Sequence, residues 1–201
     1  MRIFTRRHAF QSFGAMALAF GLAPSASFAL SEGEAKALVD KLVGEINKVI
    51  GSGKSETAMY RDFERIFSRY SDTSYMAAYT LGNDGRRATN AQKKAYSNAF
   101  ETYVARKYGG RFREFIGGRL EVTGVKAVKK WFEVSAVAYL KGQAPFEVTF
   151  LVSDRSGVHK FFNLYIEGIN MLLTERTEIG SMLDKRRGDI DALISDIKTA
   201  G

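Results

Sequence analysis

Apolar residues recur at helical spacing through the first half of the chain and at strand spacing through much of the second half. From Ala35 to Ile50 they repeat every three or four residues, behind a capping box formed by Ser31 and Glu34. Three further helices are predicted over residues 56–70, 72–81 and 90–108, the last behind a capping box of Thr89 and Gln92. Residues 111–116 are expected to continue that last helix at an angle.

The period changes to two after Gly117 and Gly118. Strands are predicted over residues 120–125, 132–140, 146–152 and 162–166. Short turns separate the last three, and short connections require antiparallel pairing. In the fourth strand, Phe162, Leu164 and Ile166 are expected to share the apolar face. Residues 168–170 should then lead into two closing helices, over 172–186 and 189–198. The predicted class is therefore α+β, an antiparallel four-stranded meander covered on one face by a helical layer.

The first 29 residues resemble an export signal. Arg2, Arg6 and Arg7 precede a short apolar run, and Ser27 and Ala29 offer the small residues of a cleavage site. The run is too short to span a bilayer. The paired arginines fit either an ordinary secretory signal or a twin-arginine signal. We therefore expect residues 1–29 to be a signal peptide and residues 30–201 to form a single domain that works outside the cytoplasm.

Composition narrows the classes of function. Loss of the signal lowers the formal charge from +8 to +5, with basic residues dispersed among acidic ones, which does not indicate nucleic-acid binding. The chain has no cysteine, so thiol chemistry and Cys–zinc sites are excluded. Only His159 remains after cleavage, no G-x-S-x-G motif is present, and the Gly53-Lys54-Ser55 turn lacks the rest of a phosphate-binding loop. We expect no catalytic residue and no metal or cofactor.

Small residues in the middle of a predicted strand leave two interpretations open. Ala136 and Ala138 stand where Val or Ile would pack better, within a ring of phenylalanines. Either they leave a hollow between sheet and helices, or a helix approaches closely and fills the space. On these residues alone we favour the second interpretation.

Two stretches of the sequence favour the first interpretation, a hollow between sheet and helices. The first reads FSRYSDTSYMAAYTLG from Phe67 and is followed by Arg86, and the second reads NLYIEGINMLLTERTEIGSMLDKRRGDI from Asn163. Both resemble the MlaC (toluene-tolerance) family of periplasmic lipid carriers. The chain departs from the usual family pattern at four positions. Gly85 replaces an aromatic residue before the arginine, His159 and Asn163 replace Trp and Asp, and Asn170 replaces Ser.

The resemblance implies a fold of the NTF2- or cystatin-like kind and a carrier role. The expected cargo is phospholipid, shuttled between an outer-membrane lipoprotein–porin complex and an inner-membrane lipid ABC transporter, which maintains outer-membrane asymmetry. A hopanoid-type cargo is the alternative within the family. The partners implied are these membrane complexes and lipid, with no nucleic acid, and the carrier is expected to be a monomer in the periplasm.

Mapped onto this chain, the resemblance places acyl chains between sheet and helices. The expected lining consists of Phe67, Tyr70, Met76, Tyr79, Phe100, Val104, Val134, Ala136, Ala138, Val148, Phe150, Phe162 and Leu164. Basic candidates for a lipid phosphate are Arg86, Arg87 and Arg111. A scaffold protein with a solid core and a periplasmic hydrolase using His159 are the rival classes.

Overall fold

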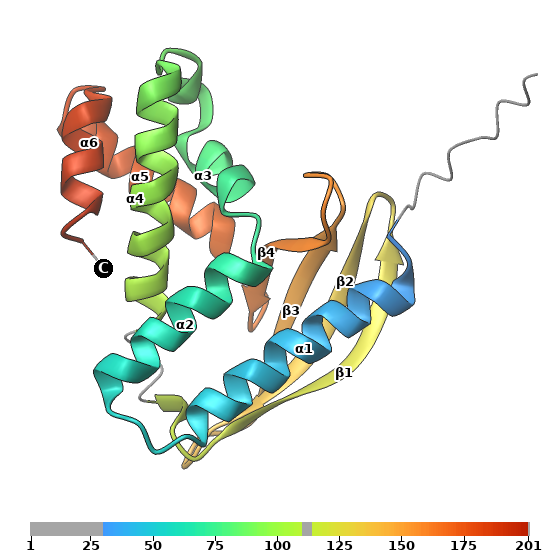
Figure 1. The fold of residues 1–201 in the computed structure, drawn as a ribbon. Helices are drawn as coiled ribbons and strands as arrows, with labels where there is room; N and C mark the ends of the chain where they lie inside the picture. The colour runs from blue at the N-terminus through green and yellow to red at the C-terminus, as the bar shows by residue number, and fades with distance from the viewer. Residues whose placement is uncertain (1–29, 110–113, 201) are drawn as a thin grey trace, which may run out of the picture.

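The computed structural model describes residues 30–109 and 114–200, so the predicted signal segment lies outside the described residues. Within them the helices and strands follow the order α1–α2–α3–η1–α4–β1–β2–β3–β4–β5–α5–α6. Figure 1 shows a twisted sheet crossed by α1, with a second group of helices beyond its far edge. The α+β class predicted from the sequence is confirmed.

The first two helices have the predicted bounds. Helix α1 (Glu32–Ile50) begins at the expected capping box, in which Ser31 Oγ accepts from the Glu34 amide at 3.3 Å and Glu34 accepts from the Ser31 amide at 2.9 Å. It ends at Gly51. Helix α2 (Glu56–Tyr70) follows and packs on α1.

The remaining helices form a group of their own. Helix α3 (Thr73–Leu81) is capped by Asp72, a 3₁₀ turn η1 (Gly82–Arg86) follows, and α4 (Asn90–Gly109) starts at the predicted Thr89–Gln92 capping box. At the end of the described chain, α5 (Met171–Lys185) and α6 (Ile190–Ile197) have nearly the predicted bounds. Part of the predicted continuation over 111–116 lies outside the described residues.

The sheet has five antiparallel strands rather than the four predicted. They are β1 (Arg119–Val128), β2 (Trp131–Tyr139), β3 (Phe146–Ser153), β4 (Lys160–Ile166) and β5 (Ile169–Asn170), in sequential order. The extra strand forms because Glu167 and Gly168 both have positive φ, 50° and 77°, which is typical of a two-residue hairpin turn. The chain therefore folds back and pairs Ile169 with Ile166 before α5 begins.

A β-bulge in β4 reverses part of the predicted alternation. Leu151 pairs with Asn163 and the next residue, Val152, pairs with Phe161, so Phe162 is an extra residue without a partner in the ladder. Phe161 packs against the rings of Phe67 and Phe150, whereas Phe162 meets different rings. The prediction that Phe162 shares a face with Leu164 is wrong for this reason.

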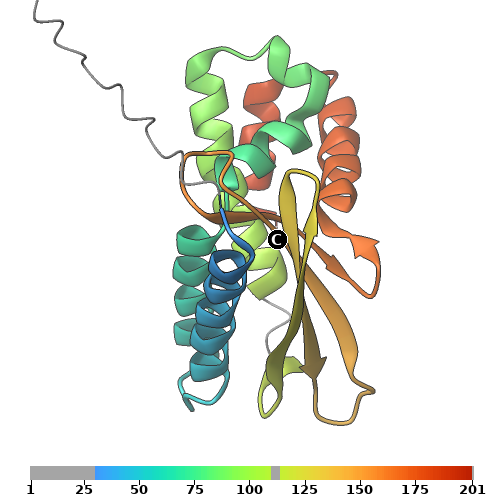
Figure 2. The ribbon, with the colours of Figure 1, turned by 90° about the vertical axis from the view of Figure 1, so that its right-hand side faces the viewer.

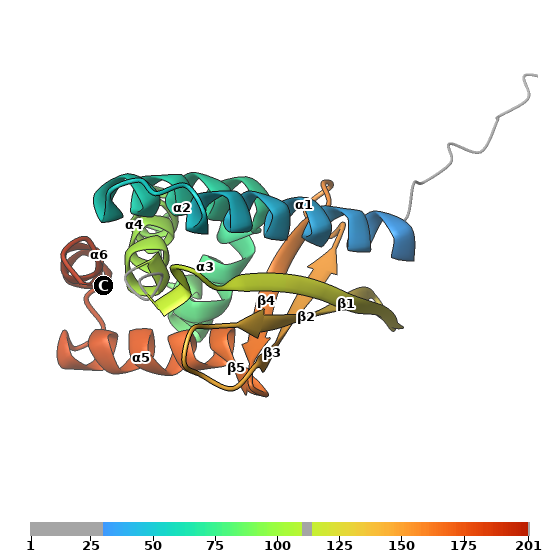
Figure 3. The same cartoon turned by 90° about the horizontal axis from the view of Figure 1, so that it is seen from below.

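The buried apolar side chains form two clusters. The first joins α1 and α2 to the sheet, and the second joins α3, α4, α5 and α6. Phe67 packs against both clusters. Figure 2 shows α1 and α2 beside the sheet and the other helices beyond its end, and Figure 3 shows α5 and α6 apart from α1 when the molecule is seen from below. The interior is thus divided between a sheet half and a helical half.

Candidate functional site: an apolar cavity between two cores

A cavity of about 450 Å³ lies where the two clusters meet. It exists because α1 packs on β1 and β2, whereas α2 and α4 pack mainly on other helices. The part of β3 and β4 that faces α2 and α4 is therefore left without close contact from these two helices. The volume lies within the range of roughly 300–1,000 Å³ common for small-molecule sites.

The lining is predominantly apolar and comes from the sheet and from helices α1 to α5. Strands β3 and β4 form one wall, α2 and α4 form the facing wall, and α5 closes a side. The apolar lining includes Leu42, Ile46, Phe63, Ile66, Phe67, Met76, Val104, Phe115, Leu120, Phe146, Val148, Phe150, Phe161, Leu164, Ile166 and Leu172. Such a surface offers hydrocarbon an environment without competing water.

Six of the sequence-predicted residues are brought together around this cavity. They are Phe67, Met76, Val104, Val148, Phe150 and Leu164. They come from α2, α3, α4 and the two strands of the wall, and they include residues of both apolar clusters. The structure thus assembles a part of the expected set at one place.

Three of the other predicted residues, all on β2, lie outside the cavity lining. Val134, Ala136 and Ala138 are fully buried, with no exposed surface, in the cluster that α1 shares with the sheet. Helix α1 contacts β1 and β2 and fills the space that the small side chains leave. Of the two interpretations of Ala136 and Ala138, the close approach of a helix is therefore the correct one.

Four predicted lining residues remain, and each of them packs at another place in the molecule. The Tyr70 hydroxyl donates to Glu45 at 2.7 Å, and the Tyr79 ring faces the guanidinium of Arg176. Phe100 is fully buried within the helical half, and the bulge turns Phe162 toward Tyr75 and Trp131. These four side chains therefore do not line the cavity.

Several lining residues were not in the predicted set. Phe63 lies one turn before Phe67 on α2 and Ile66 directly precedes it, so the helical period could have indicated them. Ile166 was expected on the apolar face of β4 but was not assigned to the site. Phe161 carried no local signal, because its inward direction results from the bulge.

Asn163 is a buried polar residue in the apolar wall. Its Oδ1 accepts from the amide of Leu172 at 3.1 Å, and its Nδ2 donates to Asn170 Oδ1 at 3.0 Å. Asn170 in turn caps α5, accepting from the amide of Leu173 at 3.0 Å. The two asparagines therefore contact each other, and together they fix the start of α5 against β4.

A second polar group lies where α4 and α5 meet. Glu175 lines the cavity with 2% of its surface exposed, and its Oε1 accepts from the Tyr108 hydroxyl at 2.5 Å and lies 2.9 Å from Lys107 Nζ. Lys107 also pairs with Glu178, and Tyr103 donates to Glu178 at 3.0 Å. The group thus joins the two helices through charge-assisted hydrogen bonds.

The donors in this group keep their protons at neutral pH. Burial and the hydrogen bond to Glu175 raise the pKa of the Tyr108 hydroxyl above its usual range. Burial disfavours the charged form of Lys107, but its bonds to Glu178, Glu175 and Tyr103 outweigh this and raise the pKa of Lys107. Tyr108 and Lys107 therefore remain hydrogen-bond donors to Glu175.

The cavity reaches solvent between the β2–β3 turn and the β4–β5 turn. Its exposed lining residues are Glu114, Gln143, Ala144 and Glu167. Close to them in the chain, Ile169 and Leu173 expose 59% and 50% of their surface. Exposed apolar side chains beside the mouth offer a surface for contact with a membrane or a partner protein.

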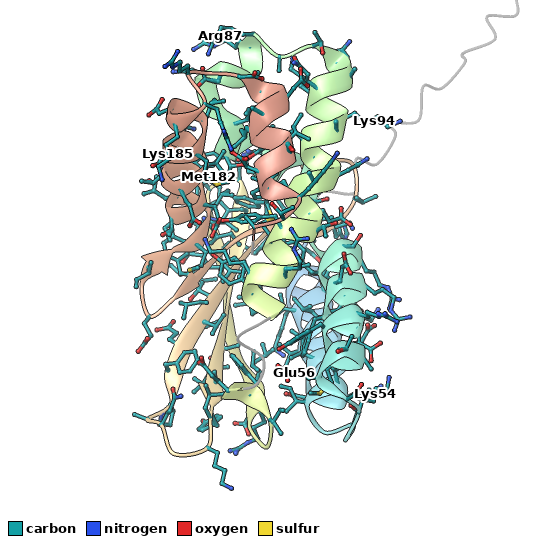
Figure 4. All side chains as sticks on the ribbon, turned by 90° about the vertical axis from the view of Figure 1, so that its left-hand side faces the viewer. Lys54, Glu56, Arg87, Lys94, Met182 and Lys185 are labelled. Carbon is teal, nitrogen blue, oxygen red and sulfur yellow. The ribbon has the colours of Figure 1, made fainter. Side chains whose placement is uncertain are left out.

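Two of the three predicted phosphate contacts do not line the cavity or its mouth. Arg86 donates to Asn83 and Arg87 pairs with Asp84 in η1, and neither lines the cavity. Figure 4 shows Arg87 at the end of the helical half, on the opposite end of the molecule from Lys54. Arg111 lies outside the described residues.

The candidate groups for catalysis do not gather around the cavity. His159 precedes β4 and lies near the start of α1, where it makes a small contribution to the lowered pKa of Glu34, which is set first by hydrogen bonds from Ser31. Within residues 30–109 and 114–200 there is no group of three or more potential metal ligands. No helix of these segments has the length and apolarity required to cross a bilayer.

Comparisons with known proteins agree with this arrangement. A family model described as MlaC protein matches residues 36–199. Among solved structures, the chain is similar to a phospholipid-binding protein from Ralstonia solanacearum, determined in complex with a phospholipid. The TM-score is 0.69, the sequences are 16% identical, and the match covers 81% of this chain and 94% of that one. At that identity the similarity shows a shared fold.

Proposed function

The chain belongs to the MlaC family, and on that premise we propose that it is a periplasmic lipid carrier that holds phospholipid acyl chains in the cavity. The observation that carries the proposal is the apolar cavity at the junction of the two cores, open to solvent at one end. The similar fold of a protein solved with a phospholipid supports the same cargo class. The proposal requires binding and release, and it assigns no catalytic residue.

The energetics of such a site suit a carrier. Each methylene moved from water into an apolar environment contributes about 0.8 kcal/mol. One acyl chain of roughly 15 carbons therefore gains on the order of 10 kcal/mol, before the costs of ordering the ligand. A lipid held in this way leaves slowly into water. Transfer then requires a docked acceptor that offers a continuous apolar path.

We further propose that the acceptor and donor are membrane complexes that contact the mouth. The exposed side chains of Ile169 and Leu173 beside the mouth favour this arrangement, because they would be covered on docking. In this proposal residues 1–29 direct export, and the carrier moves lipid between an outer-membrane lipoprotein–porin complex and an inner-membrane ABC transporter. Outer-membrane asymmetry is the process served.

Mass spectrometry tests the proposal directly. Protein expressed with residues 1–29 in a Gram-negative host and purified without detergent should carry about one lipid molecule per chain. Denatured samples give the identity of the cargo, and a polycyclic hopanoid instead of a glycerophospholipid would reassign the cargo within the same role. Protein that is free of lipid and takes none from vesicles would refute the carrier function.

A further inference from the structure

Leu30, the first described residue, is packed into the fold. Its side chain is 9% exposed and belongs to the cluster that joins α1 and α2 to the sheet. It directly precedes Ser31, which caps α1, and it shares the cluster with Ala35, the fourth residue of the helix. Apolar residues at these two positions fix the direction in which a chain enters a helix. The core and α1 therefore set the position of the Leu30 backbone.

The backbone nitrogen of Leu30 meets a carboxylate from a distant part of the chain. It donates to Asp154 Oδ2 at 3.2 Å. Asp154 follows β3 and begins the turn to β4, where its carbonyl accepts from the Gly157 amide at 2.8 Å. Figure 2 shows the start of α1 beside this turn. No lysine or arginine of the described residues forms an ion pair with Asp154, so its charge is available to Leu30.

The predicted export signal ends at the same residue. Ser27 and Ala29 supply the small side chains of a cleavage site, which places the scissile bond between Ala29 and Leu30. When a signal peptidase hydrolyses this bond, the oxygen of water joins the Ala29 carbonyl carbon as a carboxylate, and both protons end on the Leu30 nitrogen. An α-amino group has a pKa of about 8, so the product is an ammonium group at neutral pH. The amide that faces Asp154 is thereby replaced by a cation.

A positive charge at the start of α1 requires compensation. The amino end of a helix carries a partial positive charge, which disfavours a cation there. The charged groups around Leu30 are mainly acidic. Glu32 and Glu34 lie in the first turn of α1, Asp154 comes from the turn after β3, and His159 acts on the charge of Glu34. The surroundings are thus suited to an ammonium group, with Asp154 in direct contact.

From these observations we infer that Asp154 is the binding site for the ammonium group of a mature amino terminus at Leu30. Signal cleavage then adds an ion pair that ties the start of α1 to the turn between β3 and β4. The processed chain is more stable than one with a residue before Leu30. Asp154 takes this role only if the predicted export signal is cleaved, and it takes it whichever molecule the cavity holds.

The first requirement is a mature chain that begins at Leu30. The full-length protein is expressed in a Gram-negative host and purified from the periplasm, and its intact mass is measured. We expect the mass of residues 30–201 with an unmodified amino terminus. Any other first residue would overturn the inference, whether or not the sample contains lipid.

The contribution of the ion pair is measured on two chains that differ by one residue. Both are released from the same fusion by a protease that leaves no extra residue, and both are delipidated. One begins at Leu30, and the other begins at Ala29, which keeps the Leu30 amide but moves the charge one residue away. The first should melt about 2–4 °C higher, the size of one partly buried ion pair in a domain of this length.

Two substitutions assign that difference to Asp154. Asp154→Asn keeps the size of the side chain and removes its charge, so the two chains should then melt at the same temperature. Asp40→Asn is the matched control. Asp40 is an exposed carboxylate of α1 that pairs with Lys36, so the difference between the two chains should remain.

Labelling of the two chains without substitution keeps the inference testable if Asp154→Asn does not fold. An ammonium group paired with a carboxylate stays protonated to higher pH. At pH 8 the amino terminus at Leu30 should therefore react with an amine reagent about tenfold more slowly than the one at Ala29, with the exposed Lys41 as internal reference.

Equal melting temperatures, equal labelling rates, or a difference in melting that persists in Asp154→Asn would overturn the inference. None of these measurements depends on the uptake of lipid, so the carrier function stands or falls separately.

Discussion

Ala136 and Val148 face each other across two neighbouring strands, yet they lie in different surroundings. Ala136 pairs with Val148 in the β2–β3 ladder. Both belong to the cluster that contains α1, but Val148 also lines the cavity, whereas the fully buried Ala136 does not. The boundary between solid core and hollow therefore runs between two adjacent strands, and a bulky side chain should have opposite effects on its two sides.

We predict that Val148→Phe reduces bound lipid while the protein stays folded, because the ring extends into the cavity. Ala136→Phe should instead lower the free energy of unfolding by about 1–3 kcal/mol, because the ring must displace α1. Urea unfolding and lipid quantification by mass spectrometry on both variants measure the two effects. An Ala136→Phe protein that is fully stable but free of lipid would show that the cavity reaches Ala136.

The residues of the cavity wall also show which inward-facing side chains can be predicted from the sequence and which cannot. Val148, Phe150 and Leu164 follow a simple alternation, so their inward direction could be predicted. Phe161 and Phe162 are adjacent phenylalanines, and only the pairing of β4 with β3 decides which one faces the cavity. That choice depends on the register of two strands, which no local pattern encodes.

Among the elements, the helices were the most predictable. Helices α1 and α4 carry capping boxes at their starts, and α3 and α6 carry capping aspartates. A few adjacent residues therefore determine where each of these helices begins. Strand β5 has only two residues, Ile169 and Asn170, and its existence depends on a turn that returns the chain to β4. Such a short strand has no alternation to recognise.

A single carboxylate ties the loop between α1 and α2 to α2. Asp62 of α2 accepts from Lys54 Nζ at 2.7 Å and also bonds Arg65. The hydrogen bond from Lys54 lowers the pKa of Asp62, burial opposes this, and Arg65 lowers it further. Since the folded-state pKa lies below the unfolded value, the charged Asp62 stabilises the fold at neutral pH, and this contribution is lost as the pH falls.

We predict that Asp62→Asn lowers the free energy of unfolding at pH 7 by about 1 kcal/mol, a modest value because Lys54 is half exposed. The difference from the unchanged protein should disappear as the pH falls below 3.8 and through the lower folded-state pKa. Denaturant unfolding between pH 7 and pH 2.5 measures it. Asp40→Asn, which breaks the exposed Lys36–Asp40 pair, should change little, and a pH-independent effect of Asp62→Asn would contradict the assignment.

At the scale of the whole molecule, the cavity separates two clusters that would otherwise form one interior. Lining residues of the sheet half and the helical half face each other across it. Phe67 packs against both clusters, and Asn163 and Asn170 join β4 to α5. Hydrocarbon in the cavity would add contacts between the halves that the chain itself does not supply.

We predict that removal of bound lipid lowers the melting temperature, and that adding it back restores the value. Ligand at a hundred times its dissociation constant stabilises a folded protein by about 2.7 kcal/mol. Amide exchange should quicken on delipidation in β3, β4 and α5, with less change in β2 and in the first half of α1, which do not line the cavity. Identical melting curves for loaded and lipid-free protein, with the difference in load verified by mass spectrometry, would contradict this account.

The divided interior also bears on how long each form of the molecule survives. Lipid bound as proposed would make one continuous core, whereas without it the two halves depend on contacts such as those of Phe67. Local opening exposes backbone to proteolysis, and the empty form should open more often. On the proposed function, we therefore expect the lipid-free protein to be degraded sooner than the lipid-bound protein, so that the supply of lipid sets the abundance of the protein that binds it.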